Sequence, residues 1–173
     1  DPYGVTHRTA WPGNPDYITW WDGIVEDLVR THPFIAGVKF GQERGGPLCN
    51  AIIGNGAFCF CDHCRRRGHE QGIDVDRAAR GYRELLDYVQ ATGAGEKPRD
   101  GHLVTLLRIF MRYPEILAWD TQWYGLREGH RKRIYGQIKA MAPRMQVGWH
   151  MVHGVSYDPF IRAQLDYEQI SHY

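Results

Sequence analysis

The sequence predicts an α/β fold in which parallel strands are covered by outer helices. Two stretches, 35–40 and 145–151, have the composition of short buried strands, and they alternate with segments whose apolar residues recur at helical spacing. The link between the first helix and the first strand is only a couple of residues long, as in α/β units. This alternation indicates a parallel sheet with helices on its outside.

The first helix has a strong start at Asn14, with Pro15 at its first helical position and Asp16 in its first turn. Its apolar residues follow at helical spacing until His32 and Pro33 end the helix: Ile18, Trp21, Val25, Leu28 and Val29. The stretch 35–40 then predicts a short strand, which closes in the glycine-rich sequence GQERGGP.

The next segment, 44–72, contains all four cysteines and is expected to be a long loop. Beyond it, Asp74 or Asp76 opens a helix with one apolar face, made of Tyr82, Leu85, Leu86 and Val89. This helix ends in the glycine-rich stop at 92–95. A second helical piece is predicted over 103–111, and a long helix from Pro114 to Ala142.

After the strand at 145–151, Asp158 and Pro159 predict a last helix through Ile161, Leu165 and Tyr167. Two strands cannot make a sheet of this kind by themselves. Either more strands are hidden in the chain, or the chain is the middle of a larger barrel. We favour the second: residues 1–173 would form one partial (β/α)8 TIM-barrel domain, with 44–72 as a loop inserted within it.

Composition excludes several classes of function. The chain has 173 residues, 43% of them hydrophobic, which is enough for one core. Its net charge of +1 provides no field to attract nucleic acid, and we expect neither a nucleic-acid nor a membrane partner. The absence of an initiator Met favours a piece of a longer protein. The oligomeric state and the compartment stay open.

The cysteines follow the pattern C-x9-C-x-C-x2-C, formed by Cys49, Cys59, Cys61 and Cys64. Four clustered thiolates suit a tetrahedral, structural Zn²⁺, whereas a disulfide framework would spread its cysteines along the chain. His69 is the alternative fourth ligand if Cys49 is not one. Reduced cysteines without a metal are the other interpretation. The neighbouring arginines 65–67 are expected to form a solvated face rather than a phosphate site.

Glu43 is the candidate catalytic residue because it follows the carboxyl end of the first predicted strand. In α/β barrels the active site is built at that rim, and a carboxylate there can act as a general acid. Gln42 and Arg44 flank Glu43 and are candidates for substrate binding. The alternative is a solvated Glu43 paired with Arg44, which would contribute little.

The second predicted strand ends in Trp149 and His150, which are further candidates for substrate contact. A tryptophan ring can stack on a sugar, and an imidazole can bond to its hydroxyl groups. Strand alternation puts the two side chains on opposite faces, so at most one of them points toward a barrel axis. The alternative interpretation is that Trp149 belongs to the core.

These motifs together resemble a family. The combination of Gly41-Gln42-Glu43 with the sequence CFCDHCR at 59–65 resembles the zinc-containing microbial β-galactosidases, and is even more similar to uncharacterised glycoside-hydrolase-like barrels of bacteria. The resemblance implies a carbohydrate substrate, Glu43 as general acid/base, and Cys59, Cys61 and Cys64 as zinc ligands. In this chain Gln42 replaces the asparagine of the galactosidases, and Cys49 lies inside the loop rather than upstream.

The resemblance also implies that the nucleophilic carboxylate of a retaining glycosidase lies beyond Tyr173, so this chain would lack it. Two other functions stay open. One is a carbohydrate-binding barrel without hydrolytic activity. The other is a small zinc-knuckle interaction module, in which the two strands pair with each other and loss of zinc unfolds the entire chain.

Overall fold

The computed structural model describes residues 1–6, 13–42, 45–54, 58–151 and 166–170. The chain divides into two compact units, and each is described by itself. Unit 1 consists of Asp1–Asn14 and Gly45–Gly125, and unit 2 of Pro15–Arg44 and Leu126–Tyr173. Among the described helices, none combines the length and the apolar composition that crossing a bilayer requires.

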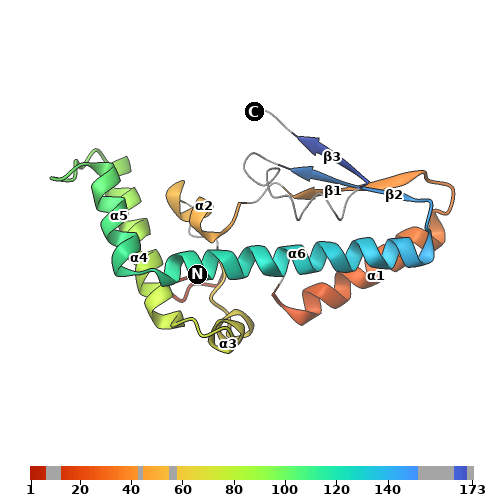
Figure 1. The fold of residues 1–173 in the computed structure, drawn as a ribbon, viewed down its shortest axis with the longest axis horizontal. Helices are drawn as coiled ribbons and strands as arrows, with labels where there is room; N and C mark the ends of the chain where they lie inside the picture. Colours follow the sequence, from red (N-terminus) through yellow and green to blue (C-terminus); the bar gives the residue numbers. More distant parts are fainter. Residues whose placement is uncertain (7–12, 43–44, 55–57, 152–165, 171–173) are drawn as a thin grey trace. The chain divides into compact units, whose positions relative to one another are not determined.

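Unit 2 contains a parallel sheet of three strands in the order β1-β2-β3 (Figure 1). These strands are β1 (Gly37–Gln42), β2 (Gln146–Met151) and β3 (Tyr167–Ile170). Val38 is opposite Val147, and Gly148 is opposite Tyr167. Because all strands run in one direction, their carboxyl ends meet at a single edge of the sheet.

Helices cover one face of this sheet (Figure 1). They are α1 (Pro15–Thr31) and the second part of α6 (Glu115–Met141). Strand alternation turns Val38 of β1 and both Val147 and Trp149 of β2 toward the helices. There they join Val25 and Val29 of α1, and Ile134 and Ile138 of α6, in one buried apolar cluster. Burial of these side chains is the main stabilising contribution to unit 2.

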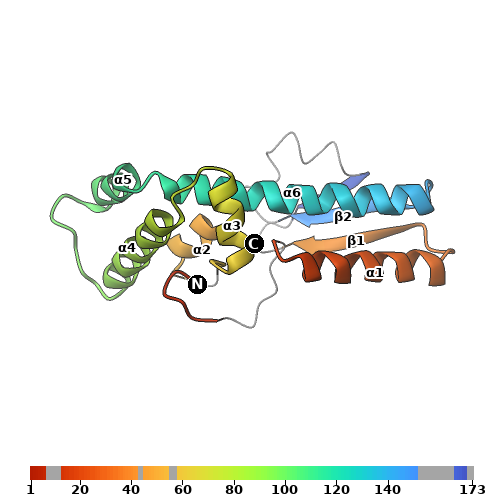
Figure 2. The ribbon, with the colours of Figure 1, turned by 90° about the horizontal axis from the view of Figure 1, so that it is seen from below.

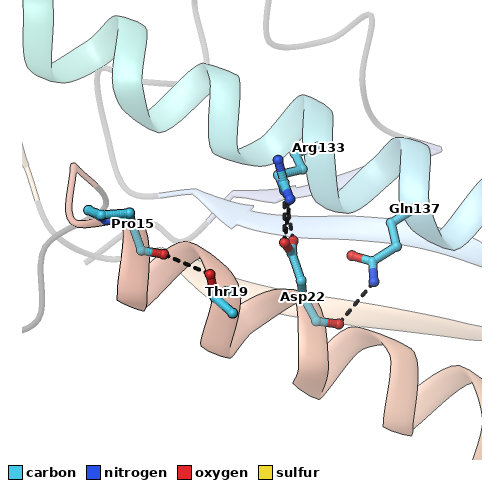
Figure 3. Close-up of polar contacts among 5 residues, drawn as sticks. All are labelled: Pro15, Thr19, Asp22, Arg133 and Gln137. Atoms are coloured by element: carbon cyan, nitrogen blue, oxygen red, sulfur yellow. Dashed lines mark hydrogen bonds and ion pairs between the residues drawn. The ribbon is translucent and has the colours of Figure 1, made fainter.

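A polar contact fixes α1 against α6 within unit 2 (Figure 3). The guanidinium of Arg133 donates to both carboxylate oxygens of Asp22, at 2.8 Å from Nε to Oδ1 and 2.5 Å from Nη2 to Oδ2. The hydrogen bond from Arg133 lowers the pKa of Asp22. Nε2 of Gln137 also donates to the main-chain oxygen of Asp22 at 2.9 Å. The two helices therefore have a defined axial register.

Unit 1 is helical in its described part (Figure 2). It comprises α2 (Pro47–Ile52), α3 (Asp62–Glu70), α4 (Val75–Gly93), α5 (His102–Arg112) and the first part of α6. The carboxylate of Asp74 caps α4 by accepting a hydrogen bond from the backbone N–H of Arg77 at 2.9 Å. The buried face of α4 repeats at helical spacing through Val75, Ala78, Tyr82, Leu85 and Leu86.

Two glycines allow the helices of unit 1 to approach closely. A Cβ at Gly81 would lie 2.6 Å from Cβ of Tyr113, and one at Gly68 would lie 2.7 Å from the ring of Trp119. Neither distance is compatible with a larger residue unless a neighbour moves. These glycines are therefore required by packing rather than by backbone conformation.

The α/β class and most of the expected elements are confirmed. The helices at 15–31, 75–93, 102–112 and 115–141 and the strands at 37–42 and 146–151 lie where the sequence predicts them, within a few residues. The expected loop at 44–72 differs, because it contains the helices α2 and α3. From Gly45 onward, this segment belongs to unit 1 together with the helices that follow it, as far as Gly125.

The C-terminal part of the chain requires a correction. Tyr167 was expected at the end of a last helix, but it begins strand β3. The rest of that expected helix, 158–165, lies outside the described residues. At least one further strand was therefore hidden in the chain. Membership of a closed barrel stays a prediction.

Candidate metal centre

Three cysteines of unit 1 lie close enough together to hold one metal ion. The sulfur atoms of Cys59, Cys61 and Cys64 all lie within 4.8 Å of one another. Cys59 and Cys61 precede α3, and Cys64 lies in its first turn. Cys64 is buried, Cys59 is half-buried and Cys61 is exposed, so the cluster is open to solvent on one side.

The segment before α3 packs on the core of unit 1 and brings Cys59 with it. Phe58 and Phe60 are 2% and 8% exposed and belong to that core, and the intervening Cys59 is half-buried and packs against the same core. The backbone N–H of Cys61 then donates to the sulfur of Cys59 at 3.4 Å. Hydrogen bonds of this kind favour a thiolate, which is the form that binds metal.

Aromatic packing fixes the backbone that carries the cysteines. The ring of Phe60 stacks on Trp119 with 4.4 Å between centroids and 4° between planes. Phe58 lies against Tyr82, at 4.7 Å between centroids. Nε2 of Gln122 donates to the main-chain oxygen of Cys64 at 3.4 Å. The sulfur atoms are therefore attached to a rigid part of unit 1, as a preorganised site requires.

The three thiols shift one another's pKa values. The thiol of Cys64 donates a hydrogen bond to Cys59, which lowers the pKa of Cys59 to about 6. The same contact, with burial, raises the pKa of Cys64, and burial raises the pKa of Cys61. A cation among the three sulfur atoms would favour the thiolate form of each and release protons.

The structure does not bring the two expected fourth ligands into the cluster. Cys49 lies in α2 and is exposed, and His69 lies in the last turn of α3. Neither belongs to the group formed by Cys59, Cys61 and Cys64. Three cysteine ligands are therefore supported by the described residues, one fewer than the spacing of the cysteines predicts.

The predicted rim site lies partly outside the described residues. Glu43 and Arg44 lie outside the described residues. Gln42 is the last residue of β1 and His150 is near the end of β2, where His150 is opposite Gly41. The backbones of Gln42 and His150 thus lie near each other at the carboxyl edge of the sheet. Their side chains are not described.

Trp149 is a core residue in this structure. It is 3% exposed, and its ring lies 5.0 Å from that of Phe40 between centroids. The guanidinium of Arg131 lies over the same ring at 5.3 Å. This burial agrees with the alternative interpretation of Trp149. A role in sugar stacking stays a prediction that requires the ring to become accessible.

Three buried basic residues of α6 were missed at the sequence level. Arg127 and Arg131 are each 1% exposed, and His130 is 8% exposed. Burial lowers the pKa of His130, whose ring lies beside those of Tyr17 and Trp21. Their spacing in the sequence could have predicted this burial, because Arg127, His130 and Arg131 share a helical face with the apolar Ile134.

Comparisons with models of protein families, with curated proteins and with solved structures gave no match for this chain.

Proposed function

We propose that unit 1 binds one Zn²⁺ through Cys59, Cys61 and Cys64, and that the ion has a structural role. The observation that carries the proposal is the mutual proximity of three cysteine sulfur atoms on a backbone fixed by Phe58 and Phe60. Thiolate ligands select soft or borderline cations, and zinc is the commonest of these in tetrahedral cysteine sites. The ion would hold the start of α3 to the segment that precedes it.

Zinc content of the purified protein tests this proposal. We expect stoichiometric zinc in the parent protein, and at least about tenfold weaker binding after Cys61→Ser, because the variant removes a thiolate ligand. Cys49→Ser is the matched control, since Cys49 is exposed and lies outside the cluster. Full zinc retention in a variant that lacks Cys59, Cys61 and Cys64 together would refute the assignment. Equal losses of zinc in Cys49→Ser and Cys61→Ser would instead support a site with four cysteine ligands, Cys49 among them.

We further propose that the chain is part of a glycoside-hydrolase-like (β/α)8 barrel that acts on carbohydrate. Support comes from the resemblance of its motifs and from the parallel order of β1, β2 and β3, with helices covering one face. In such a barrel the segment after β1 carries catalytic groups, and Glu43 is the candidate acid/base.

Hydrolysis of aryl glycosides by the longest available form of the protein tests the second proposal. We expect Glu43→Gln to lower the rate at least about a hundredfold, because general acid catalysis contributes this much or more. The control is Glu70→Gln, a change at an exposed residue of α3. Sugar binding without turnover would favour a non-catalytic carbohydrate-binding barrel instead. Equal rates in Glu43→Gln and the parent would exclude Glu43 as the acid.

A further inference from the structure

A cavity in unit 1, separate from the cysteine sulfur atoms, has the features of an anion site. Its volume is about 430 Å3, and it is lined by residues 1–4, by Phe60 and by side chains of α3 and α4. This volume is within the range of small-molecule sites, roughly 300–1,000 Å3. Phe60 and Ala79 contribute apolar surface, and both are largely buried.

Three guanidinium groups line this cavity, from Arg65 of α3 and from Arg80 and Arg83 of α4. Arg80 and Arg83 are three residues apart, so they lie on the same face of the helix. Nη1 of Arg83 donates to the main-chain oxygen of Pro2 at 2.7 Å, which holds its side chain beside the cavity. Arginines of both α3 and α4 therefore line the cavity, and the side chain of Arg83 is held there by its hydrogen bond.

The carboxylates of the lining do not neutralise all of this charge. Asp76 pairs with Arg65 at 2.5 Å between Oδ1 and Nη2. The side chain of Asp1 accepts hydrogen bonds from the backbone N–H groups of Tyr3 and Val5. Within the described part of the chain, Arg80 forms neither a hydrogen bond nor an ion pair, although its charge helps Arg65 to lower the pKa of Asp76.

We propose that this cavity binds a small ligand through an oxyanion, that is, a phosphate, sulfate or carboxylate group. Arg80 presents its fork of N–H donors to the anion, and Arg83 adds its remaining donors from one turn away. Such bidentate, charge-assisted hydrogen bonds are the strongest that a guanidinium makes. The space beside Phe60 and Ala79 accommodates the uncharged part of the ligand. The inference does not depend on the zinc or the carbohydrate proposal.

Calorimetric titration of the full chain with inorganic phosphate, sulfate and glucuronate tests the proposal and distinguishes the sources of the anion. We expect saturable binding of at least one of these, weakened by added salt. Arg80→Gln should lower the affinity about tenfold or more, because it removes a charged donor to the anion. Arg80→Lys should give an intermediate loss, since it keeps the charge but not the fork.

Arg66→Gln is the matched control, because Arg66 is an exposed arginine of α3 that does not line the cavity. The affinity of the Arg66→Gln variant for the anion should equal that of the unsubstituted protein. Equal losses in Arg66→Gln and Arg80→Gln would show general electrostatic attraction and overturn the proposal. So would the absence of saturable binding for all three anions. Since Arg80 is exposed, its variants should remain folded, which a thermal melt verifies.

Discussion

At the scale of single residues, burial decides which candidates are available for chemistry. Cys61 is exposed and Cys59 half-buried, so an ion could reach them from solvent. Trp149 is a similar type of candidate by sequence, but its ring is enclosed between Phe40 and Arg131. A reactive or aromatic residue type therefore indicates a site only where the surrounding packing leaves it accessible.

His130 is the residue for which burial has the clearest consequence for stability. Its ring is 8% exposed, and Nδ1 has no hydrogen-bond partner among the described residues. Burial lowers its pKa, while Asp22 opposes and Arg133 reinforces that shift. The unfolded state therefore takes up the proton first. The neutral ring of His130 makes its full contribution to the free energy of unfolding above a pH of about 6.5, the ordinary pKa of histidine. This contribution is lost as the pH falls through the lower pKa of His130 in the folded state.

Chemical denaturation at a series of pH values checks this expectation. We expect His130→Phe to reduce the loss of unfolding free energy between about pH 7 and pH 5, because the variant has no imidazole to protonate. Phenylalanine also suits the aromatic surroundings formed by Tyr17 and Trp21. The exposed His69→Gln serves as the control. A pH dependence unchanged in His130→Phe would contradict the assignment.

At the scale of elements, the helices of unit 1 depend on the segment that carries the cysteines. Phe58 and Phe60 pack on Tyr82 of α4 and on Trp119 of α6. Gly68 of α3 also lies against Trp119. Movement of the segment at 58–64 would therefore disturb the packing of α3, α4 and the first part of α6.

If the cysteine cluster holds the proposed zinc ion, removal of that ion should act on particular elements. On chelation we expect faster amide hydrogen exchange in α3 and in the neighbouring part of α4, because the metal no longer holds the segment before α3. The strands β1 and β2 belong to unit 2, which has its own apolar cluster, and should keep their protection. Loss of protection throughout both units would instead favour the small zinc-knuckle module, in which zinc holds the entire chain.

At the scale of the whole molecule, local signals predicted the elements better than their assembly. Asn14, Pro15 and Asp74 identified helix starts correctly, because capping depends on a few neighbouring residues. The helices α2 and α3 were missed, although Pro47 opens α2 and Asp62 lies in the first turn of α3. α2 has only six residues and α3 has nine, most of them polar, so neither helix shows the extended apolar periodicity on which the sequence prediction relied.

The candidate sites show the same division. The motif C-x-C-x2-C sufficed to predict that Cys59, Cys61 and Cys64 lie close together, because residues 59–64 form one short segment of the chain. The position of Cys49 depends on α2, and the cavity of Arg80 and Arg83 depends on how residues 1–4 pack on α4. Both features depend on contacts between residues that are distant in sequence, and such contacts leave no periodic pattern in the sequence from which they could be predicted.

By itself, the sequence determined the α/β class, the long helices, two of the strands and the cysteine cluster, because each follows from interactions over a few residues. Only the tertiary structure decided that Trp149 is enclosed, that Cys49 stands apart and that Tyr167 begins a third parallel strand. The physical reason is that burial and strand pairing are properties of contacts between distant segments, and these are fixed only when the apolar faces of helices and strands pack together.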